Sequence, residues 1–307
     1  MKKNVVLEAM NVSVVLKNKI LVRNVSFTVQ EGQILGVVGD NKSGKSSLAK
    51  VLCGSLPVSD GTVFVMNQNI EKYPELLHSV SLSLDPPVFF KNQTVRNNVK
   101  YLCSLSGTKP TKDKVNTALR KFGLEARAKS KMKYLSYYER KLVSLALAFI
   151  NEPKIAILDE PFKGISEERQ DKMREFIKQL KAQNIAVIVT AKDYETIENL
   201  CSRYIFMENR KIVKILDGKE CELAPDTITY AFVEVKYPHY VGKLLKKEFN
   251  FDIKLLDKKV LFVASENKLA DVVEFLSTKK IEVKETGYLK TKTEQILANM
   301  TPFYTGG

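Results

Sequence analysis

The chain has 307 residues, 44% of them hydrophobic, enough to bury a sizeable core in one large domain or two smaller ones. Its formal net charge is +14, but the lysines are spread over the whole length, which favours a solvated surface over a nucleic-acid partner. The four cysteines lack CxxC spacing and there are only two histidines, which argues against a protein-bound zinc site and a disulfide framework.

No apolar run reaches the roughly 18 to 20 residues that a membrane-spanning helix needs. The longest candidate, residues 142–150, is interrupted by Ser144. The first three residues are not followed by the hydrophobic segment of a signal peptide. We therefore expect a cytoplasmic protein that does not span the membrane.

The N-terminal part of the chain predicts strands with one helix between them. Segments rich in Val, Ile and Phe predict strands over residues 25–29, 33–38 and 62–65. The helix is expected to begin near Ser43 and to run through Leu52, and Gly54 is typical of a helix stop because glycine accepts a positive φ. The predicted order is strand, glycine-containing loop, helix.

A mostly helical insert is predicted over about residues 89–150. Its clearest signal is the spacing of Val115, Leu119 and Phe122, which repeat at i, i+4 and i+7 after Thr111 and before Gly123. Such spacing places apolar side chains on one face of a helix.

Beyond the insert, short apolar runs at residues 154–158 and 185–190 are typical of strands buried on both faces of a parallel sheet. The segment between them carries a helical apolar stripe made of Met173, Phe176, Ile177 and Leu180. Strands that alternate with helices predict an α/β fold, with ligand chemistry at the carboxyl ends of the strands.

A polar connection at residues 217–227, with Gly218, Pro225 and Asp226, predicts a domain boundary. We expect one domain over residues 1–218 and another over 226–307. In the second domain the sequence predicts strands at 230–235, 253–256, 260–264 and 281–284, helices at 240–249 and 268–276, and a final helix. This order is that of a small α+β domain of the βαββαβ type.

The loop before the first helix matches GxxxxGK[ST], and its residues are Gly39, Asp40, Asn41, Lys42, Ser43, Gly44, Lys45 and Ser46. Backbone N–H groups and the helix N-terminus can cradle phosphate, Lys45 can reach the β- and γ-phosphates, and the Ser46 hydroxyl can bind Mg²⁺. The strand–loop–helix setting favours this interpretation over an ordinary glycine turn. We expect a P-loop NTPase sheet that binds a nucleoside triphosphate, with Ser47 also at the nucleotide.

Two adjacent carboxylates, Asp159 and Glu160, follow the apolar run 155–158. Asp159 is placed to hold Mg²⁺ through water, and Glu160 to orient and polarise the attacking water. Paired acids after a strand are weak evidence alone, but together with the phosphate loop they indicate a nucleotide hydrolase.

These motifs, with Asp-Glu-Pro at 159–161 and Leu-Ser at 135–136 before a helix, resemble the ATPase subunits of ABC transporters, from about residue 5 to residue 218. The segment 282–300 is similar to the C-terminal extension of ABC ATPases that serve drug, antibiotic and bacteriocin exporters. The resemblance implies ATP and Mg²⁺, a membrane permease partner, a location on the inner face of the cell membrane, and a homodimer or heterodimer. In such dimers the signature of one subunit closes over the γ-phosphate held by the other.

The resemblance also identifies departures from the family pattern. The signature reads Leu135-Ser136-Tyr137-Tyr138-Glu139, which keeps Ser136 as a phosphate contact but replaces both glycines by tyrosines. Packing at a helix entry and obstruction of the dimer are both open for these tyrosines.

Three further motif positions are altered. Asp85 stands at the glutamine-loop position, where its carboxylate is a candidate metal ligand. Lys192 stands at the switch-histidine position, where it is expected to hold phosphate charge without carrying a proton near neutral pH. Ser166 replaces the D-loop aspartate, and Leu16 occupies the place of the adenine-stacking aromatic residue.

Two functions remain open at this point. The first is an ATPase that drives export through a separate permease, and Glu160 favours it. A heterodimer whose partner supplies an intact signature is a variant of this function. The second is a regulatory ATP-binding subunit with little hydrolysis that gates or stabilises a complex, favoured by the altered motifs. In either case the resemblance makes Phe89, Phe90 and Tyr101 of the insert candidates for permease contact.

Overall fold

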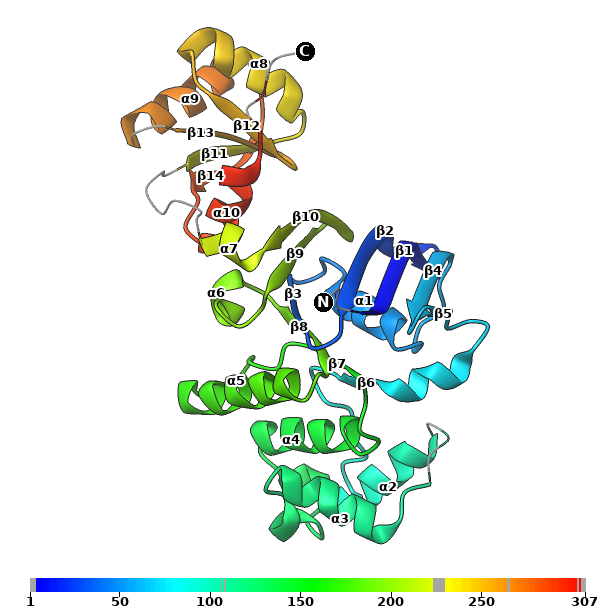
Figure 1. The fold of residues 1–307 in the computed structure, drawn as a ribbon. Coiled ribbons are helices and arrows are strands. Elements are labelled where there is room, and N and C mark those ends of the chain that lie inside the picture. Colours follow the sequence, from blue (N-terminus) through cyan, green and yellow to red (C-terminus); the bar gives the residue numbers. More distant parts are fainter. Residues whose placement is uncertain are drawn as a thin grey trace. The chain divides into compact units, whose positions relative to one another are not determined.

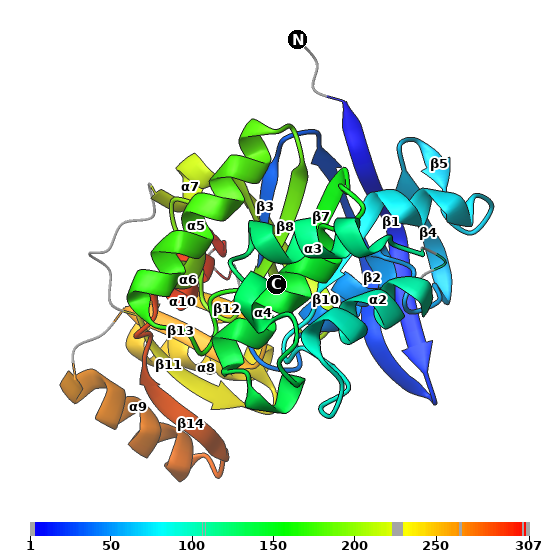
Figure 2. The same cartoon turned by 90° about the horizontal axis from the view of Figure 1, so that it is seen from below.

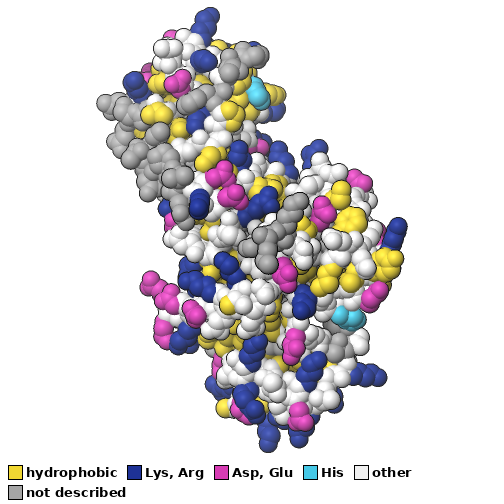
Figure 3. All heavy atoms as spheres, in the orientation of Figure 1, with side chains coloured by type: hydrophobic (Ala, Val, Ile, Leu, Met, Phe, Trp, Pro, Cys, Tyr) yellow, Lys and Arg dark blue, Asp and Glu magenta, His cyan; other side chains and the backbone are white. Residues whose placement is uncertain are grey.

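The computed structural model describes residues 4–105, 107, 109–222, 230–263, 266–302 and 304. The chain divides into two compact units, Met1–Gly218 and Lys219–Gly307. Within the described ranges, no helix has both the length and the apolar character required to cross a membrane. On the face shown in Figure 3, Lys and Arg side chains are scattered over both units among acidic and apolar ones.

The first unit contains two sheets (Figure 1). An antiparallel sheet has the order β2-β1-β4-β5, with β1 at Val5–Leu16, β2 at Lys19–Gln30, β4 at Asp60–Val65 and β5 at Gln68–Asn69. The larger sheet has the order β10-β9-β3-β8-β7-β6, formed by β3 (Ile34–Val38), β6 (Val80–Ser83), β7 (Ile155–Leu158), β8 (Ala186–Ala191), β9 (Arg203–Glu208) and β10 (Lys211–Asp217). All its pairs are parallel except β9 with β10.

The predicted parallel sheet is confirmed, and its central strands explain the apolar runs in the sequence. β3, β7 and β8 are buried at every residue. Helix α1 (Lys45–Leu52) joins side chains of both sheets in one hydrophobic core, in which Leu48, Val51 and Leu52 are almost fully buried. Helices α4 (Tyr137–Ala148), α5 (Glu167–Ala182) and α6 (Tyr194–Ile197) also pack against the larger sheet.

The segment expected to be helical contains α2 (Val95–Leu105), α3 (Lys112–Lys121) and α4, which pack against one another around a core of their own (Figure 2). Thr111 caps α3, as its side chain accepts a hydrogen bond from the backbone of Lys114, and Gly123 has a φ of 67° after the helix. Short 3-10 helices lie at Pro74–Ser79, Glu125–Arg127 and Met132–Tyr134. In α5 the predicted stripe is buried at Met173, Ile177 and Leu180.

The second unit has the predicted βαββαβ order and a final helix. Its antiparallel sheet runs β12-β13-β11-β14, with β11 at Tyr230–Val235, β12 at Ile253–Leu256, β13 at Lys259–Val263 and β14 at Val283–Tyr288. Helices α8 (Pro238–Phe249) and α9 (Glu266–Thr278) share one hydrophobic core with it, whereas Ala298 of α10 (Lys292–Met300) packs in a second core with Tyr230 and Phe232.

The polar connection predicted at 217–227 contains the short helix α7 (Gly218–Glu222). One detail of the sequence interpretation needs correction. The last strand lies at Val283–Tyr288 rather than at 281–284. Pro225 and Asp226, and the end of the strand expected to reach Ala264, lie outside the described residues.

Candidate active site

The loop between β3 and α1 depends on two close-packed glycines. A side chain at Gly39 would collide with the carbonyl oxygen of Met207 and with Ser43. Gly44 has a φ of 105° and directly precedes α1. Lys42 also has a positive φ, 72°. These left-handed residues fold the loop back so that it leads into the N-terminus of the helix.

Lys45 lies across this loop. Its side chain is only 5% exposed, and its ammonium donates to the carbonyl oxygens of Gly39 and, at 3.1 Å, of Asp40. The same ammonium lies 3.5 Å from Oε1 of Glu160. Lys45 therefore connects the loop after β3 to the residue pair after β7.

Asp159 is buried and accepts two hydrogen bonds on one oxygen. Oδ1 receives the Ser46 hydroxyl at 3.1 Å and the Thr190 hydroxyl at 2.7 Å. Oδ2 is also buried and has no hydrogen-bond partner in the part of the chain that the structure describes. Oxygen atoms of a hydroxyl and a carboxylate suit Mg²⁺, so Ser46 and Asp159 together fit this ion.

Glu160 is held by its backbone in an uncommon conformation. Its φ is 47°, which non-glycine residues rarely adopt. Its N–H donates to the Thr190 hydroxyl at 2.9 Å, and its carbonyl accepts from the Lys141 ammonium at 2.5 Å and from the Lys163 N–H at 3.2 Å. Such a residue costs about 1–3 kcal/mol and persists only when its surroundings fix it.

Thr190 and Lys141 were not among the residues that sequence reasoning selected for the site. Thr190 is a polar residue near the end of the buried run of β8, next to the strand that carries Asp159. That position is a signal that could have identified it. Lys141 has no such signal, because a lysine within a helix is ordinarily solvated.

The structure contradicts the expectation that Asp85 is a metal ligand. Its side chain is 2% exposed and accepts a hydrogen bond from the Tyr137 hydroxyl. The ammonium groups of Lys141 and Lys163 lie 3.1 Å from its Oδ1 and Oδ2 respectively. A metal cation would have to displace these positive groups, so Asp85 does not fit one.

The same contacts set the ionisation of Asp85. Burial raises its pKa, but the Tyr137 hydroxyl and the two ammonium groups outweigh burial and hold the pKa below its usual value. Burial, followed by the bond to Asp85, raises the pKa of Tyr137. Asp85 is thus an ionised carboxylate whose charge is neutralised by lysines.

The remaining predicted residues lie in two places. Lys192 is exposed and follows β8 directly, next to Ala191, whose carbonyl accepts the Gly39 N–H at 3.3 Å. It therefore shares the carboxyl edge of the sheet with the phosphate loop. Ser136 instead caps α4, where its hydroxyl accepts the Glu139 N–H. In the loop, Asp40, Asn41 and Ser46 are exposed and Ser47 is half-buried.

Comparison with known proteins decides the family. The sequence model of the family described as ABC transporter matches residues 22–163. A putative ABC transporter ATP-binding protein of Pyrococcus furiosus, PF0528, is 32% identical over 204 residues, which cover 65% of this chain and 75% of that protein. The chain belongs to the ATP-binding proteins of ABC transporters.

Other similarities extend further along the chain. The ABC transporter ATP-binding protein YhcH of Bacillus subtilis, itself uncharacterized, is 26% identical over 299 residues, 96% of both chains. A solved ATP-binding subunit of an ABC transporter superposes with a TM-score of 0.62 at 21% identity, over 71% of this chain and 92% of that chain. The predicted P-loop NTPase fold is confirmed.

This ABC ATP-binding protein is accordingly a nucleotide-binding ATPase subunit. The ATP-binding cassette MJ0796, solved as a dimer in a post-hydrolysis state with ADP and Pi, superposes with a TM-score of 0.61 at 18% identity, over 69% of this chain and 98% of that chain.

In this subunit the tyrosines at the signature glycine positions both pack within their own unit. Tyr137 donates to Asp85, and a side chain added at Gly164 would lie 3.0 Å from the Tyr137 ring. The guanidinium of Arg169 lies 4.5 Å from the centre of the Tyr138 ring. These contacts support the packing role of the tyrosines at the entry of α4.

Proposed function

We propose that this chain is the motor subunit of an ABC transporter and that Glu160 activates the water that attacks ATP. The observation that carries the proposal is the convergence of Lys45, Ser46, Asp159 and Glu160 at the carboxyl edge of the parallel sheet. These residues come from two segments far apart in the sequence, and their chemistry suits phosphoryl transfer to water.

Each residue has a distinct role in the proposal. Backbone N–H groups of residues 39–47 hold the phosphates, and Lys45 neutralises the β- and γ-phosphate oxygens. Ser46 and Asp159 would hold Mg²⁺, which would neutralise phosphate charge. The buried Oδ2 of Asp159, which has no hydrogen-bond partner among the described residues, supports this. Glu160 accepts the proton of the attacking water. Lys192 stabilises negative charge on the γ-phosphate.

The site is completed by a second ATP-binding subunit. In the proposal Ser136 contacts the γ-phosphate held by the partner subunit. Tyr137 and Tyr138 put bulk where the signature glycines let backbone approach phosphate. They favour a heterodimer, in which a different subunit supplies an intact signature to the site of this chain, over a homodimer.

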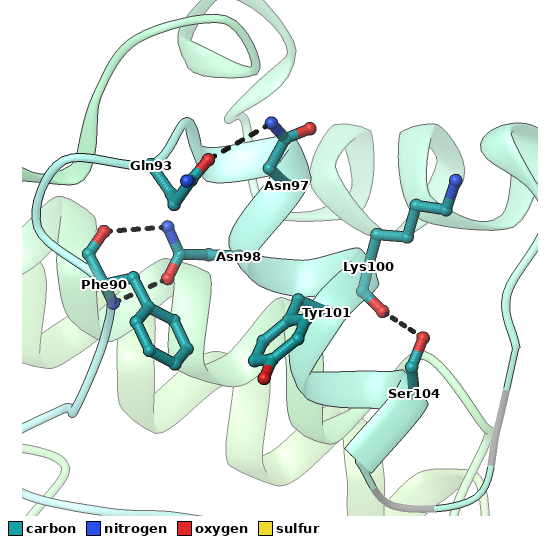
Figure 4. Close-up of a pocket in the computed structure, with 7 residues that line it drawn as sticks. All are labelled: Phe90, Gln93, Asn97, Asn98, Lys100, Tyr101 and Ser104. Atoms are coloured by element: carbon teal, nitrogen blue, oxygen red, sulfur yellow. Dashed lines mark hydrogen bonds between the residues drawn. The ribbon is translucent and has the colours of Figure 1, made fainter.

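We further propose that the permease contacts the helical insert through Phe90 and Tyr101. These rings are 48% and 52% exposed and pack edge to face, with centroids 5.2 Å apart (Figure 4). Asn98 fixes the backbone of Phe90: its Oδ1 accepts a hydrogen bond from the Phe90 N–H at 2.8 Å, and its Nδ2 donates one to the Phe90 carbonyl at 3.1 Å. Phe89 packs against the core of the insert instead. Exposed paired aromatics suit a protein contact, which would hold this subunit on the inner face of the cell membrane.

Export is the proposed direction of transport. It rests on the likeness of residues 282–300 to the C-terminal extension of exporter ATPases. Uptake of labelled substrate into inside-out vesicles, driven by ATP, is the expected behaviour; efflux from such vesicles would contradict the direction.

A regulatory subunit with little hydrolysis is the second candidate. Tyr137 and Tyr138 at the signature, together with Lys192 in place of a histidine, favour it. Both candidate functions include ATP binding, and they differ in whether the bound ATP is hydrolysed efficiently.

Steady-state phosphate release at saturating MgATP separates them. The purified subunit is measured alone and with its co-purifying partner, beside Lys45→Ala and Glu160→Gln. Loss of turnover in both variants supports the motor subunit. Tight ATP binding with no Glu160-dependent turnover would favour the regulatory one.

A further inference from the structure

Next to the Glu160 backbone lies a charge cluster, buried at Asp85 and Lys141, that the proposed reaction does not use. It consists of Asp85 after β6, Tyr137 and Lys141 of α4, and Lys163 after β7. The side chains of Asp85 and Lys141 are 2% and 6% exposed. A buried ammonium is costly unless it is paired and hydrogen-bonded, so the position of Lys141 requires a physical reason.

Lys141 connects two segments of the chain. Its ammonium lies 3.1 Å from Oδ1 of Asp85 and donates to the Glu160 carbonyl at 2.5 Å. Among the described residues, it donates the only side-chain hydrogen bond to that carbonyl. The negative Asp85 compensates the charge of the ammonium, and Tyr137 and Lys163 hold Asp85 in place.

The hydrogen bond from Lys141 is made to Glu160, whose backbone conformation is strained. Glu160 has a φ of 47°, and Thr190 fixes its N–H while Lys141 fixes its carbonyl. Because the peptide units on both sides of the Glu160 Cα are held, the direction in which the side chain leaves the backbone is fixed. The carboxylate of Glu160 in turn lies 3.5 Å from Lys45 at the phosphate loop.

We propose that Lys141 is a positioning residue for ATP hydrolysis: neutralised by Asp85, it clamps the Glu160 carbonyl and so aims the carboxylate at the attacking water. The inference rests on the proposed role of Glu160. Lys141 does not touch the nucleotide in this mechanism, so it affects the chemical step and not the affinity for ATP.

Lys163 offers a control for the ion pair with Asp85, with the difference that its side chain is 58% exposed. Lys163→Met and Lys141→Met each remove an ammonium that contacts Asp85 at 3.1 Å. Only Lys141→Met also removes the side-chain bond to Glu160, since Lys163 reaches that carbonyl through its backbone N–H. Lys141→Arg keeps a cation that can donate to both partners.

The kinetic test compares these variants with the wild-type full chain at saturating MgATP. A catalytic group displaced by about 1 Å loses on the order of 100-fold in rate, so Lys141→Met is expected to lower kcat on that scale with an unchanged Kd for ATP. Lys141→Arg is expected to restore most of kcat, and Lys163→Met to stay within a few-fold of wild type. Equal losses in both methionine variants, or a wild-type kcat in Lys141→Met, would overturn the inference.

Hydrogen–deuterium exchange of residues 159–165 provides a readout that does not depend on turnover. Lys141→Met is expected to speed exchange in this segment while Lys163→Met leaves it near wild type; unchanged exchange in Lys141→Met contradicts the clamp. Wild-type protein without Glu160-dependent hydrolysis would refute the proposed function, and the exchange comparison would still decide whether Lys141 fixes Glu160.

Discussion

Thr190 joins the two carboxylate residues of the site. Its hydroxyl donates to Asp159 and accepts from the Glu160 N–H. Thr190→Val keeps the shape and leaves the part-buried Glu160 N–H without its acceptor, which costs about 1–3 kcal/mol. Denaturant unfolding is expected to show this loss, with a lower kcat, while Thr190→Ser stays close to wild type. A valine variant as stable and active as wild type would mean that the hydroxyl is dispensable.

The charge of Asp85 predicts a dependence of stability on pH. Its native pKa is below the ordinary 3.8, because the Tyr137 hydroxyl and the lysines outweigh burial. The stabilisation is therefore fully present above the unfolded pKa and is lost as pH falls through the lower native pKa.

Asp85→Asn removes this charge and leaves Lys141 buried without its counter-ion, which costs about 3–5 kcal/mol near neutral pH. The difference in unfolding free energy between wild type and Asp85→Asn is expected to narrow below about pH 4. Urea unfolding at a series of pH values measures it. A difference in unfolding free energy that stays constant down to acid pH would show that the Asp85 charge is not the source of the stabilisation.

At the scale of elements, the aromatic pair on the insert predicts that permease binding can be weakened without loss of basal ATP hydrolysis. Phe90→Ala with Tyr101→Ala is expected to keep basal ATP hydrolysis and to weaken co-purification with the permease at least tenfold, about 1.4 kcal/mol. Tyr73→Ala is the control, since Tyr73 is similarly exposed, 47%, but lies outside the insert. Equal permease recovery in the double variant and the control would remove this surface from the interface.

Some strands could be predicted from the sequence and others could not, for physical reasons. β3 and β7 were predictable because both of their faces are buried, which demands continuous apolar runs. β6 was missed because Ser81 and Ser83 interrupt its pattern, and β10 because half-buried residues at a sheet edge carry no clear alternation.

In the site too, some features could be predicted from the local sequence and others could not. The phosphate loop and the acids after β7 follow from local spacing, so their positions could be predicted. The ammonium contacts of Asp85 could not, because they join β6, α4 and the loop after β7, and only the tertiary fold brings these together. A motif position alone therefore suggested a metal ligand where the structure has an ion-pair cluster.

At the scale of the whole molecule, the two units have separate hydrophobic cores. Phe262 is fully buried in the second, and Phe262→Ala is expected to cost about 3–5 kcal/mol there. Calorimetry is expected to show a lower transition temperature for the second unit. The affinity for ATP is expected to stay unchanged. MgATP at 100 times its Kd is expected to stabilise the first unit by about 2.7 kcal/mol. A single transition that both changes shift together would contradict the expectation of a separate transition for the second unit.

Single-turnover cleavage of bound ATP tests the central claim most directly, because it separates chemistry from binding and product release. Labelled MgATP is bound to the subunit in complex with its partner, and conversion to ADP is followed after rapid quenching. The account predicts cleavage by the wild type and, in Glu160→Gln, equal binding with cleavage slowed by about 100-fold or more. Cleavage at the wild-type rate in Glu160→Gln, or bound ATP that the wild type leaves intact, would contradict it.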